Sequence, residues 1–206
     1  MMIYDQNSDA YSIVKIFKDQ SSWQAEQRYL NYLRQQDLSV PEITCIEPLI
    51  LHMKVIQGKT ACELIEDYEA ADQNMPEQNL QALVSLMREI YQTPLFRDNH
   101  LILGDVNWRN FLLSDQDHKV YRIDLESVRT GDITDEAGSL IAFLLTYKPE
   151  LTKIKCQAAS LLSSLLCQQL DINKDRLSAA VSNQLRIIDQ RRGTQYHQAF
   201  ISRHIF

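Results

Sequence analysis

The apolar pattern of this chain changes character near Gly58, and no other feature limits the possible fold as much. Before this glycine, short runs rich in β-branched and apolar residues indicate strands. These runs cover residues 2–4, 12–17, 43–46 and 49–56. A helix is expected from the capping residues Ser21 and Ser22 to about Gln36. The polar residues 5–10 between the first two runs predict a turn, and hence a hairpin.

After Gly58, apolar residues recur at helical spacing, with a single exception. Helices are expected over residues 61–68, 76–91, 136–147, 151–170 and 174–192. The exception is a pair of short apolar runs, 111–113 and 120–123, which flank a polar turn and predict a second hairpin. Strands first and helices after, with one hairpin among the helices, predict an α+β molecule of two lobes. Residues 1–57 would form a reduced, β-rich N-lobe, and residues 58–206 a mainly helical C-lobe.

Charge and composition exclude several classes of protein. The 206 residues include 27 acidic and 21 basic side chains, a net charge of −6, which disfavours a general nucleic-acid binder. No stretch approaches the ~18 apolar residues of a membrane helix, and the first residues lack the pattern of a signal peptide. The cysteines form no C-x-x-C pair, which argues against zinc and fits a reducing compartment. We therefore expect a cytoplasmic protein without a membrane or nucleic-acid partner.

The segment 101–126 holds the residues best suited to chemistry. Asp105 and Asn110 lie five positions apart in an irregular stretch, and Asp124 ends the second strand of the predicted hairpin. Because antiparallel strands of similar length begin and end side by side, the hairpin would bring Asn110 and Asp124 together. The three side chains would then converge on one edge of a cleft. Oxygen ligands of this kind suit Mg²⁺, which takes one or two carboxylates and fills its other positions with water and phosphate.

The same segment resembles the catalytic loop of the protein-kinase-like superfamily. Residues 103–113, LGDVNWRNFLL, are closest in style to the G-D-x-x-x-x-N loop of the aminoglycoside and choline phosphotransferases. Residues 123–126, IDLE, resemble the metal-binding segment of that branch. Residues 131–137 resemble the G-D-x-x-x-D-L-A segment that opens its next helix. The resemblance implies a bilobal protein-kinase-like fold.

The first 58 residues agree with this resemblance in order. The sequence IVKIF resembles the strand that carries the ATP-binding lysine, here Lys15, and Glu26 falls where the glutamate partner of that lysine would lie. The sequence LHMKVIQG resembles the hinge between the lobes. Backbone groups of Lys54, Val55 and Ile56 would meet adenine there.

The resemblance implies a role for each polar residue in phosphoryl transfer. Asp105 would orient a substrate hydroxyl and accept its proton, while Asn110 and Asp124 would hold Mg²⁺ at the nucleotide phosphates. Lys15 would contact the α- and β-phosphates, and Glu26 would hold this lysine in place. The implied function is transfer of the ATP γ-phosphate to a hydroxyl of a small molecule, with ATP and Mg²⁺ as cofactors.

Three departures from the family pattern bear on this interpretation. Only 14 residues precede Lys15 and none is a glycine, so the glycine-rich loop that covers the phosphates is missing. The turn of residues 5–10 is another candidate cover, but it is acidic and would repel phosphate. Leu103 stands where the family often has histidine. Asn107 stands where Ser/Thr protein kinases usually carry lysine, which disfavours a protein substrate.

Two other functions stay open at this point. A pseudokinase would use the same fold as a binding or scaffolding module, and the missing loop favours it. A small atypical protein kinase fits the chain length but not Asn107. A protein partner that supplies the missing cover is a further expectation. Each residue also has a purely structural interpretation: Lys15 and Glu26 as solvated charges, Asp105, Asn110 and Asp124 as turn formers, and Trp108 as a packing residue.

Overall fold

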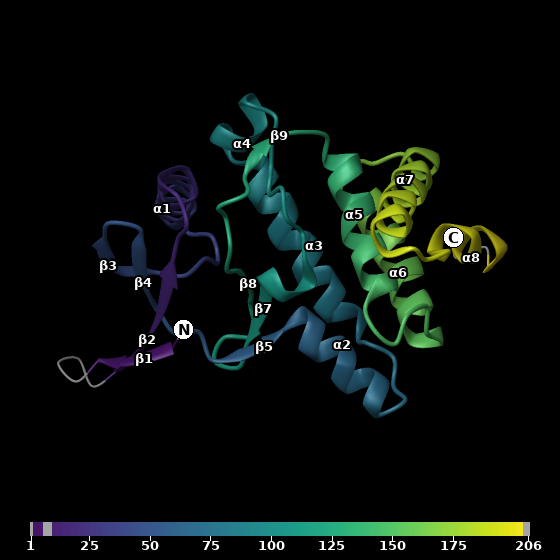
Figure 1. The fold of residues 1–206 in the computed structure, drawn as a ribbon, viewed down its shortest axis with the longest axis horizontal. Coiled ribbons are helices and arrows are strands. Elements are labelled where there is room, and N and C mark those ends of the chain that lie inside the picture. Colours follow the sequence, from purple (N-terminus) through teal and green to yellow (C-terminus); the bar gives the residue numbers. More distant parts are fainter. Residues whose placement is uncertain (1, 6–9, 204–206) are drawn as a thin grey trace.

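The structure of the protein, a computed structural model, describes residues 2–5 and 10–203. Its N-lobe contains β1 (Met2–Asp5), β2 (Ala10–Ile16), α1 (Gln20–Gln35), β3 (Ile43–Glu47) and β4 (Ile50–Lys54). The four strands form one antiparallel sheet in the order β1-β2-β4-β3 (Figure 1). The predicted hairpin of the first two strands is confirmed, with Ile3 opposite Ser12. Residues 6–9 of its turn lie outside the described residues.

Helix α1 begins at a different cap from the one that the sequence indicated. Its N-cap is Asp19, not Ser21 or Ser22. The Asp19 carboxylate accepts hydrogen bonds from the hydroxyl of Ser21 (2.5 Å) and from the backbone N–H of Ser22 (2.8 Å), and these bonds lower the pKa of Asp19 to about 2. The prediction was wrong because the two serines serve this cap as donors and not as the acceptor. The buried side of the helix carries one carboxylate, that of Glu26, among apolar residues.

The C-lobe is mainly helical, as expected. Its helices are α2 (Ala61–Ala70), α3 (Glu77–Gln92), α4 (Pro94–Asp98), α5 (Ile133–Thr146), α6 (Lys153–Leu170), α7 (Lys174–Arg192) and α8 (Tyr196–Arg203). Five of them match the predicted helices to within a few residues at their ends, and the two short ones, α4 and α8, were not predicted. The α+β fold class, with a small antiparallel sheet in the N-lobe and a helical C-lobe, is confirmed. None of the helices in the described part of the chain combines the length and the apolar character needed to cross a membrane.

Five short strands lie among these helices. They are β5 (Gly58–Thr60), β6 (Leu101–Ile102), β7 (Phe111–Ser114), β8 (Val120–Arg122) and β9 (Arg129–Thr130). The predicted hairpin of β7 and β8 is confirmed, with Leu112 opposite Tyr121. Gly58, which was expected only to break a strand, begins β5, and β5 pairs with β7 to give a sheet in the order β5-β7-β8. The chain therefore passes from β4 through residues 55–57 directly to the edge of this hairpin (Figure 1).

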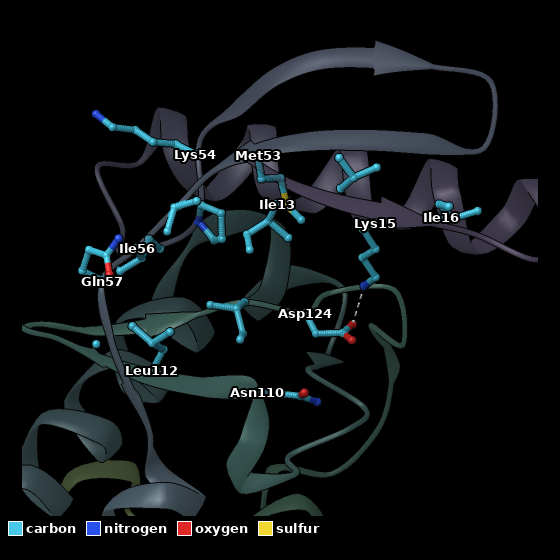
Figure 2. Close-up of a pocket in the computed structure, with 15 residues that line it drawn as sticks. Ile13, Lys15, Ile16, Met53, Lys54, Ile56, Gln57, Asn110, Leu112 and Asp124 are labelled. Atoms are coloured by element: carbon cyan, nitrogen blue, oxygen red, sulfur yellow. Dashed lines mark ion pairs between the residues drawn. The ribbon is translucent and has the colours of Figure 1, made fainter. Parts of the chain in front are cut away.

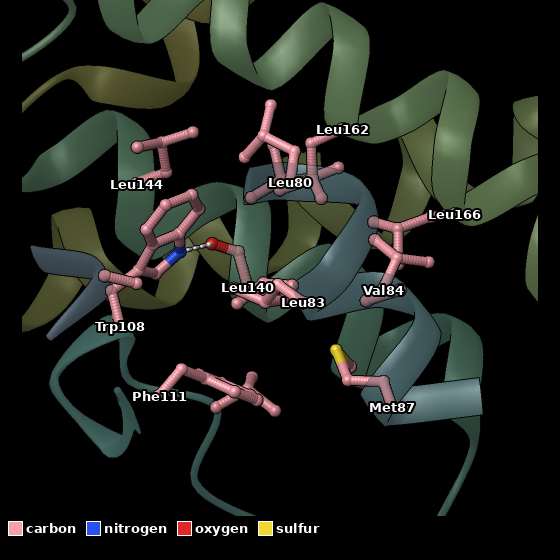
Figure 3. Packing of buried hydrophobic residues seen from close by; sticks show 14 of the residues in the cluster. Leu80, Leu83, Val84, Met87, Trp108, Phe111, Leu140, Leu144, Leu162 and Leu166 are labelled. Atoms are coloured by element: carbon pink, nitrogen blue, oxygen red, sulfur yellow. Dashed lines mark hydrogen bonds between the residues drawn. The ribbon is translucent and has the colours of Figure 1, made fainter. Parts of the chain in front are cut away.

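The hydrophobic core of the C-lobe fixes the base of that hairpin. Apolar residues of α3 face those of α6, and the indole of Trp108 lies beside them (Figure 3). Trp108 is fully buried, and its Nε1–H donates a hydrogen bond of 2.9 Å to the carbonyl oxygen of Leu140 on α5. The packing interpretation of Trp108 is therefore confirmed. Because Trp108 belongs to the loop between β6 and β7, its burial anchors that loop on α5.

Candidate functional site

A cavity of about 590 Å³ lies between the two lobes (Figure 2). Its walls come from β2, from β4 with the segment that follows it, from β7 and from the residues directly after β8. Six of the predicted site residues line it: Lys15, Lys54, Val55, Ile56, Asn110 and Asp124. Glu26 and Asp105 do not line the cavity but contact residues that do. The structure therefore brings all eight predicted residues to one region between the lobes.

The two ends of the cavity differ in chemistry. One end is apolar, with Ile13 and Met53 above it and Leu112 below it (Figure 2). The segment after β4 borders this end, and the side chain of Lys54 points away from the cavity, so this residue can contribute only its backbone (Figure 2). The other end carries the side chain of Lys15 and the polar groups opposite it. Apolar walls with backbone groups at one end and charges at the other match the adenine and phosphate ends of a nucleotide.

Lys15 is held by three carboxylates. Its Nζ lies 3.3 Å from Glu26, 3.2 Å from Asp124 and 3.2 Å from Glu126. Burial alone would lower the pKa of the Lys15 ammonium, but the three carboxylates raise it above its ordinary value. Lys15 is therefore a charged group fixed at the polar end of the cavity, and its interpretation as a solvated surface lysine is wrong.

Glu26 connects α1 of the N-lobe to the segment after β8. Its side chain is fully buried, and its Oε2 accepts a hydrogen bond of 2.6 Å from the backbone N–H of Leu125. Burial raises the pKa of Glu26 to about 7, although the nearby Lys15 acts in the opposite direction. The interpretation of Glu26 as a solvent-facing charge is therefore wrong.

Asp105 and Asn110 are joined within the loop that precedes β7. The Asn110 Nδ2 donates hydrogen bonds to the carboxylate of Asp105 (3.1 Å) and to its carbonyl oxygen (3.3 Å). The other carboxylate oxygen of Asp105 accepts from the backbone N–H of Asn107 at 3.1 Å, which is the local turn that the structural interpretation proposed. Asp124 forms a similar turn, because its Oδ1 accepts from the N–H of Glu126 at 3.3 Å. Both aspartates thus form turns, and Asn110 links Asp105 to the cavity wall that carries Asp124.

Sequence reasoning missed Arg122, which supports this loop from below. The side chain is fully buried, and its two terminal nitrogens donate to the carbonyl oxygens of Asp105 (2.6 Å) and Asn110 (3.4 Å). The guanidinium also lies over the ring of Phe111, 5.0 Å from its centroid. A signal was present in the sequence: alternation along β8 places Arg122 on the same buried face as Val120.

Glu136 also supports the loop of Asp105, although sequence reasoning named it only as part of the segment 131–137. Its buried carboxylate accepts hydrogen bonds from the backbone N–H groups of Leu103 (2.9 Å) and Gly104 (2.5 Å), and from the hydroxyl of Tyr91. Burial raises the pKa of Glu136, while the bonds from these three donors act to lower it. Gly104 itself has φ of +80°, and a Cβ there would lie 1.9 Å from the carbonyl oxygen of Ser127. The loop before Asp105 therefore requires both the glycine and the carboxylate.

The donor set fits Mg²⁺ bound together with phosphate better than a metal held by protein alone. No group of three or more histidine, cysteine, aspartate or glutamate side chains suited to a metal occurs among residues 2–5 and 10–203. One carboxylate and one amide oxygen, from Asp124 and Asn110, face the cavity. Mg²⁺ commonly takes only one or two carboxylates and completes its shell with water and nucleotide phosphates. These two residues would therefore hold Mg²⁺ once a nucleotide is bound.

One sequence expectation about phosphate cover stays untested. The turn of residues 5–10 was considered as a substitute for the glycine-rich loop, and residues 6–9 lie outside the described residues. Leu103, which stands where a histidine was expected, is fully buried and holds its place through its N–H bond to Glu136. A histidine side chain is therefore not needed at this position, because the backbone bond from Leu103 to Glu136 holds the loop.

Comparison with known families identifies the region that carries the site. Residues 4–132 match the model of the RIO domain. This range is more than half of the chain and includes every predicted site residue. RIO domains form an atypical protein-kinase-like family, so the predicted superfamily is confirmed, whereas the aminoglycoside and choline phosphotransferase branch is not supported. No curated protein sequence matches the chain.

Proposed function

The chain belongs to the RIO domain family, an atypical protein-kinase-like family, and we propose that it transfers the γ-phosphate of ATP to a hydroxyl group of a polypeptide. The observation that carries this proposal is the position of Lys15, in contact with Glu26 and Asp124 at the polar end of the cavity between the lobes. In that position the lysine can exchange a carboxylate partner for the phosphates of a nucleotide.

Each site residue has a role that follows from its surroundings. The backbone of Val55 and Ile56 borders the apolar end of the cavity and would meet the adenine base, and Lys15 would contact the α- and β-phosphates. Asn110 and Asp124 would hold Mg²⁺, which supplies positive charge that neutralises the phosphate oxygens when it is bound. The segment between the lobes would therefore hold the adenine end of the nucleotide, and residues of both lobes would hold its phosphate end.

Asp105 would act as the base. Its carboxylate accepts hydrogen bonds from the Asn110 side chain and the Asn107 backbone, which fix its orientation. A carboxylate held in this way can orient the hydroxyl of an acceptor and take its proton as the phosphoryl group transfers. This role requires the acceptor to reach the loop from outside the nucleotide cavity, because Asp105 does not line that cavity.

A second hollow lies beside the loop of Asp105, and the choice of acceptor rests on the family match. This hollow, about 270 Å³, is lined by Gly104 and Val106, the two neighbours of Asp105. It shares Asp135 and Asn183 with a further hollow of about 480 Å³ that follows α7. Asp105 itself lines neither hollow, so the hollows do not select the acceptor. The RIO domain match favours the small atypical protein kinase over the small-molecule phosphotransferase.

Asn107 no longer argues against this choice. Its side-chain oxygen accepts hydrogen bonds from the backbone N–H of Arg109 (3.0 Å) and from the hydroxyl of Tyr147 (2.7 Å). These bonds shape the short helical turn before β7. Asn107 is thus engaged by the fold itself, and the absence of a lysine at this position says little about the acceptor.

Thermal unfolding with Mg-ATP tests the nucleotide site. A ligand present at ~100 times its Kd adds ~2.7 kcal/mol to the free energy of unfolding. We expect the Tm of the wild type and of Asp105→Ala to rise in millimolar Mg-ATP. In Asp124→Ala, the rise should no longer depend on Mg²⁺. A wild type whose Tm does not respond to millimolar Mg-ATP contradicts the proposal.

Transfer of label from radiolabelled ATP tests the reaction and its acceptor. We expect an unstructured polypeptide rich in serine and threonine to be labelled, and Asp105→Ala to be slower by a factor of ~10²–10⁴. Labelling of choline or an aminoglycoside but not of the polypeptide would favour the small-molecule phosphotransferase instead. Nucleotide binding without transfer to any acceptor would favour the pseudokinase.

A further inference from the structure

Two cations are fully buried in the described part of the chain, Arg122 on β8 and Lys155 on α6. Each donates hydrogen bonds to two backbone carbonyl groups. Lys155 bonds those of Tyr147 (3.1 Å) and Pro149 (2.6 Å) and pairs with a carboxylate of α2, far from the cavity. Arg122 bonds the carbonyls of Asp105 and Asn110, and Asn110 is the last residue of the short helical turn before β7. The two buried cations are therefore chemically similar, but only Arg122 bonds the loop of Asp105 and Asn110 directly, whereas Lys155 reaches that loop only through Tyr147.

The backbone around Arg122 reinforces this support. The Arg122 N–H donates to the carbonyl of Ser39 in the N-lobe (3.0 Å), and the Ile123 N–H donates to the carbonyl of Asn110 (3.0 Å). The carbonyl of Asn110 thus receives both a main-chain donor and the guanidinium of Arg122. Arg122 is the last residue of β8, and Asp124 follows two residues later. One short segment therefore links the N-lobe, the loop with Asp105 and the carboxylate of Asp124.

Stability alone does not account for a charged residue at this position. Taking a guanidinium out of water is costly, and replacing a buried charged group with an apolar one of similar volume is often neutral or stabilising. The groups that act on Arg122 electrostatically are Asp124, Glu136, Asp105 and Tyr91, which belong to the segment after β8, to α5, to the loop before β7 and to α3. The planar guanidinium bonds two carbonyl groups at once and so holds them at a fixed distance from each other. An apolar side chain cannot do this.

We propose that Arg122 is a positioning residue that holds the loop of Asp105 and Asn110 in register with Asp124. By fixing the carbonyl of Asn110, it places the amide of that residue opposite the Asp124 carboxylate, so that both oxygens can reach one divalent cation. The consequence for catalysis rests on the proposed function, whereas the consequence for the loop does not. Groups that orient metal ligands without contacting the metal commonly change metal affinity by ~10–100-fold when they are removed.

Three variants test this inference: Arg122→Met, Arg122→Lys and, as a matched control, Lys155→Met. The first readout is Mn²⁺ titration in the presence of ADP, followed by electron paramagnetic resonance. We expect the Kd for Mn²⁺ to rise by about tenfold or more in Arg122→Met, to rise less in Arg122→Lys, and to stay at the wild-type value in Lys155→Met. A lysine keeps the charge but lacks the planar, fixed geometry with which the guanidinium spans the carbonyls of Asp105 and Asn110, which is the reason for the intermediate value.

The second readout is amide hydrogen exchange of peptides covering residues 103–113. We expect exchange there to be faster in both Arg122 variants than in the wild type, and faster in Arg122→Met than in Lys155→Met, because Lys155 touches this loop only through Tyr147. If the wild type binds no Mn²⁺ with ADP, the proposed function fails, and exchange alone decides the positioning role.

Two outcomes overturn the inference. One is an exchange rate over residues 103–113 that is the same in Arg122→Met as in Lys155→Met. The other is a wild-type Kd for Mn²⁺ in Arg122→Lys, which would show that the span between two carbonyls is not needed. If Arg122→Met does not fold, Arg122→Lys is compared with the wild type on both readouts, and wild-type values on both contradict the proposal.

Discussion

The carboxylate of Glu26 accepts a hydrogen bond of 2.6 Å from the backbone N–H of Leu125, a residue 99 positions further along the chain. The donor is the residue directly after Asp124, and the acceptor also lies 3.3 Å from the ammonium of Lys15. One buried side chain therefore fixes both Lys15, for which we propose contact with the phosphates, and the segment of Asp124, for which we propose contact with the metal. The geometry of the proposed nucleotide site depends on contact between α1 and the end of the β7–β8 hairpin.

The ionisation of Glu26 predicts a pH dependence of stability. Burial raises its pKa to about 7 in the folded protein, above the ordinary value of 4.5. The folded state therefore binds more protons than the unfolded state between these values, so this group stabilises the fold below pH 4.5 and loses that contribution as pH rises through about 7. Urea unfolding at a series of pH values should show this loss in the wild type and not in Glu26→Gln. Parallel pH curves for the two proteins would refute the assignment.

Removal of the cation at the polar end of the cavity should weaken nucleotide binding. Hydrogen bonds between charged groups contribute about 1.5–3 kcal/mol, which corresponds to ~10–100-fold in affinity. We therefore expect Lys15→Met to raise the Kd for Mg-ATP by this factor in calorimetric titrations. Lys59→Met is the control, because Lys59 pairs with Asp67 in a bridge that is more than half exposed. Equal affinities of the two variants would exclude Lys15 from phosphate binding.

Gly104 should tolerate no side chain. Its φ of +80° disfavours other residues, and an added Cβ would lie 1.9 Å from the carbonyl oxygen of Ser127. Gly193 offers a matched control, because its φ of +67° is similar but no atom lies within 4 Å of an added Cβ. Gly193→Ala should lower the free energy of unfolding by about 1 kcal/mol, through backbone strain alone. Gly104→Ala should cost clearly more, since steric overlap with backbone adds to the same strain. Chemical denaturation of both variants measures the difference, and similar losses would mean that the Ser127 segment moves freely.

Replacement of Glu136 by glutamine should disturb the loop before Asp105. The carboxylate accepts three hydrogen bonds, from Leu103, Gly104 and Tyr91, and a glutamine amide offers one acceptor oxygen in place of two. A buried donor left without a partner costs about 1–3 kcal/mol. We expect Glu136→Gln to lose this much stability in urea unfolding. We also expect its kcat to fall by a larger factor than its KM for ATP changes. A variant with unchanged kcat would show that the loop keeps its position without this carboxylate.

The features that could be predicted from the sequence are those that depend on neighbouring residues. The β7–β8 hairpin followed from two apolar runs around a polar turn, and its pairing brings Asn110 and Asp124 to the same cavity wall. Lys15 and Glu26 were placed by the order of family motifs, and they form an ion pair. The cap of α1 was misplaced because several adjacent polar residues compete for one position, and the sequence does not say which accepts.

The features that were missed depend on contacts between distant segments. Arg122 bonds carbonyls 12 and 17 positions earlier, and Tyr91 meets Glu136 across 45 positions. No local pattern encodes such pairs, although a charged residue on the buried face of a strand is a usable signal. The third carboxylate at Lys15, that of Glu126, belongs to the same category.

The choice among kinase-like families was the weakest inference from sequence. The G-D-x-x-x-x-N loop and the aspartate after β8 serve the same phosphoryl chemistry in every branch of the superfamily. They therefore identify the chemistry and not the acceptor. The RIO domain match draws on residues 4–132 as a whole, which include the hinge and the loops between motifs.

The walls of the cavity between the lobes come from two stretches of chain, and the ribosome synthesises one well before the other. Residues 13–58 supply the lysine and the hinge, and residues 110–124 supply the opposite wall. During synthesis, the cavity therefore lacks one wall until Leu125 has left the ribosomal exit tunnel and its N–H can bond to Glu26. The site that we propose for the nucleotide is therefore complete only after the second stretch has been synthesised and has folded against the first.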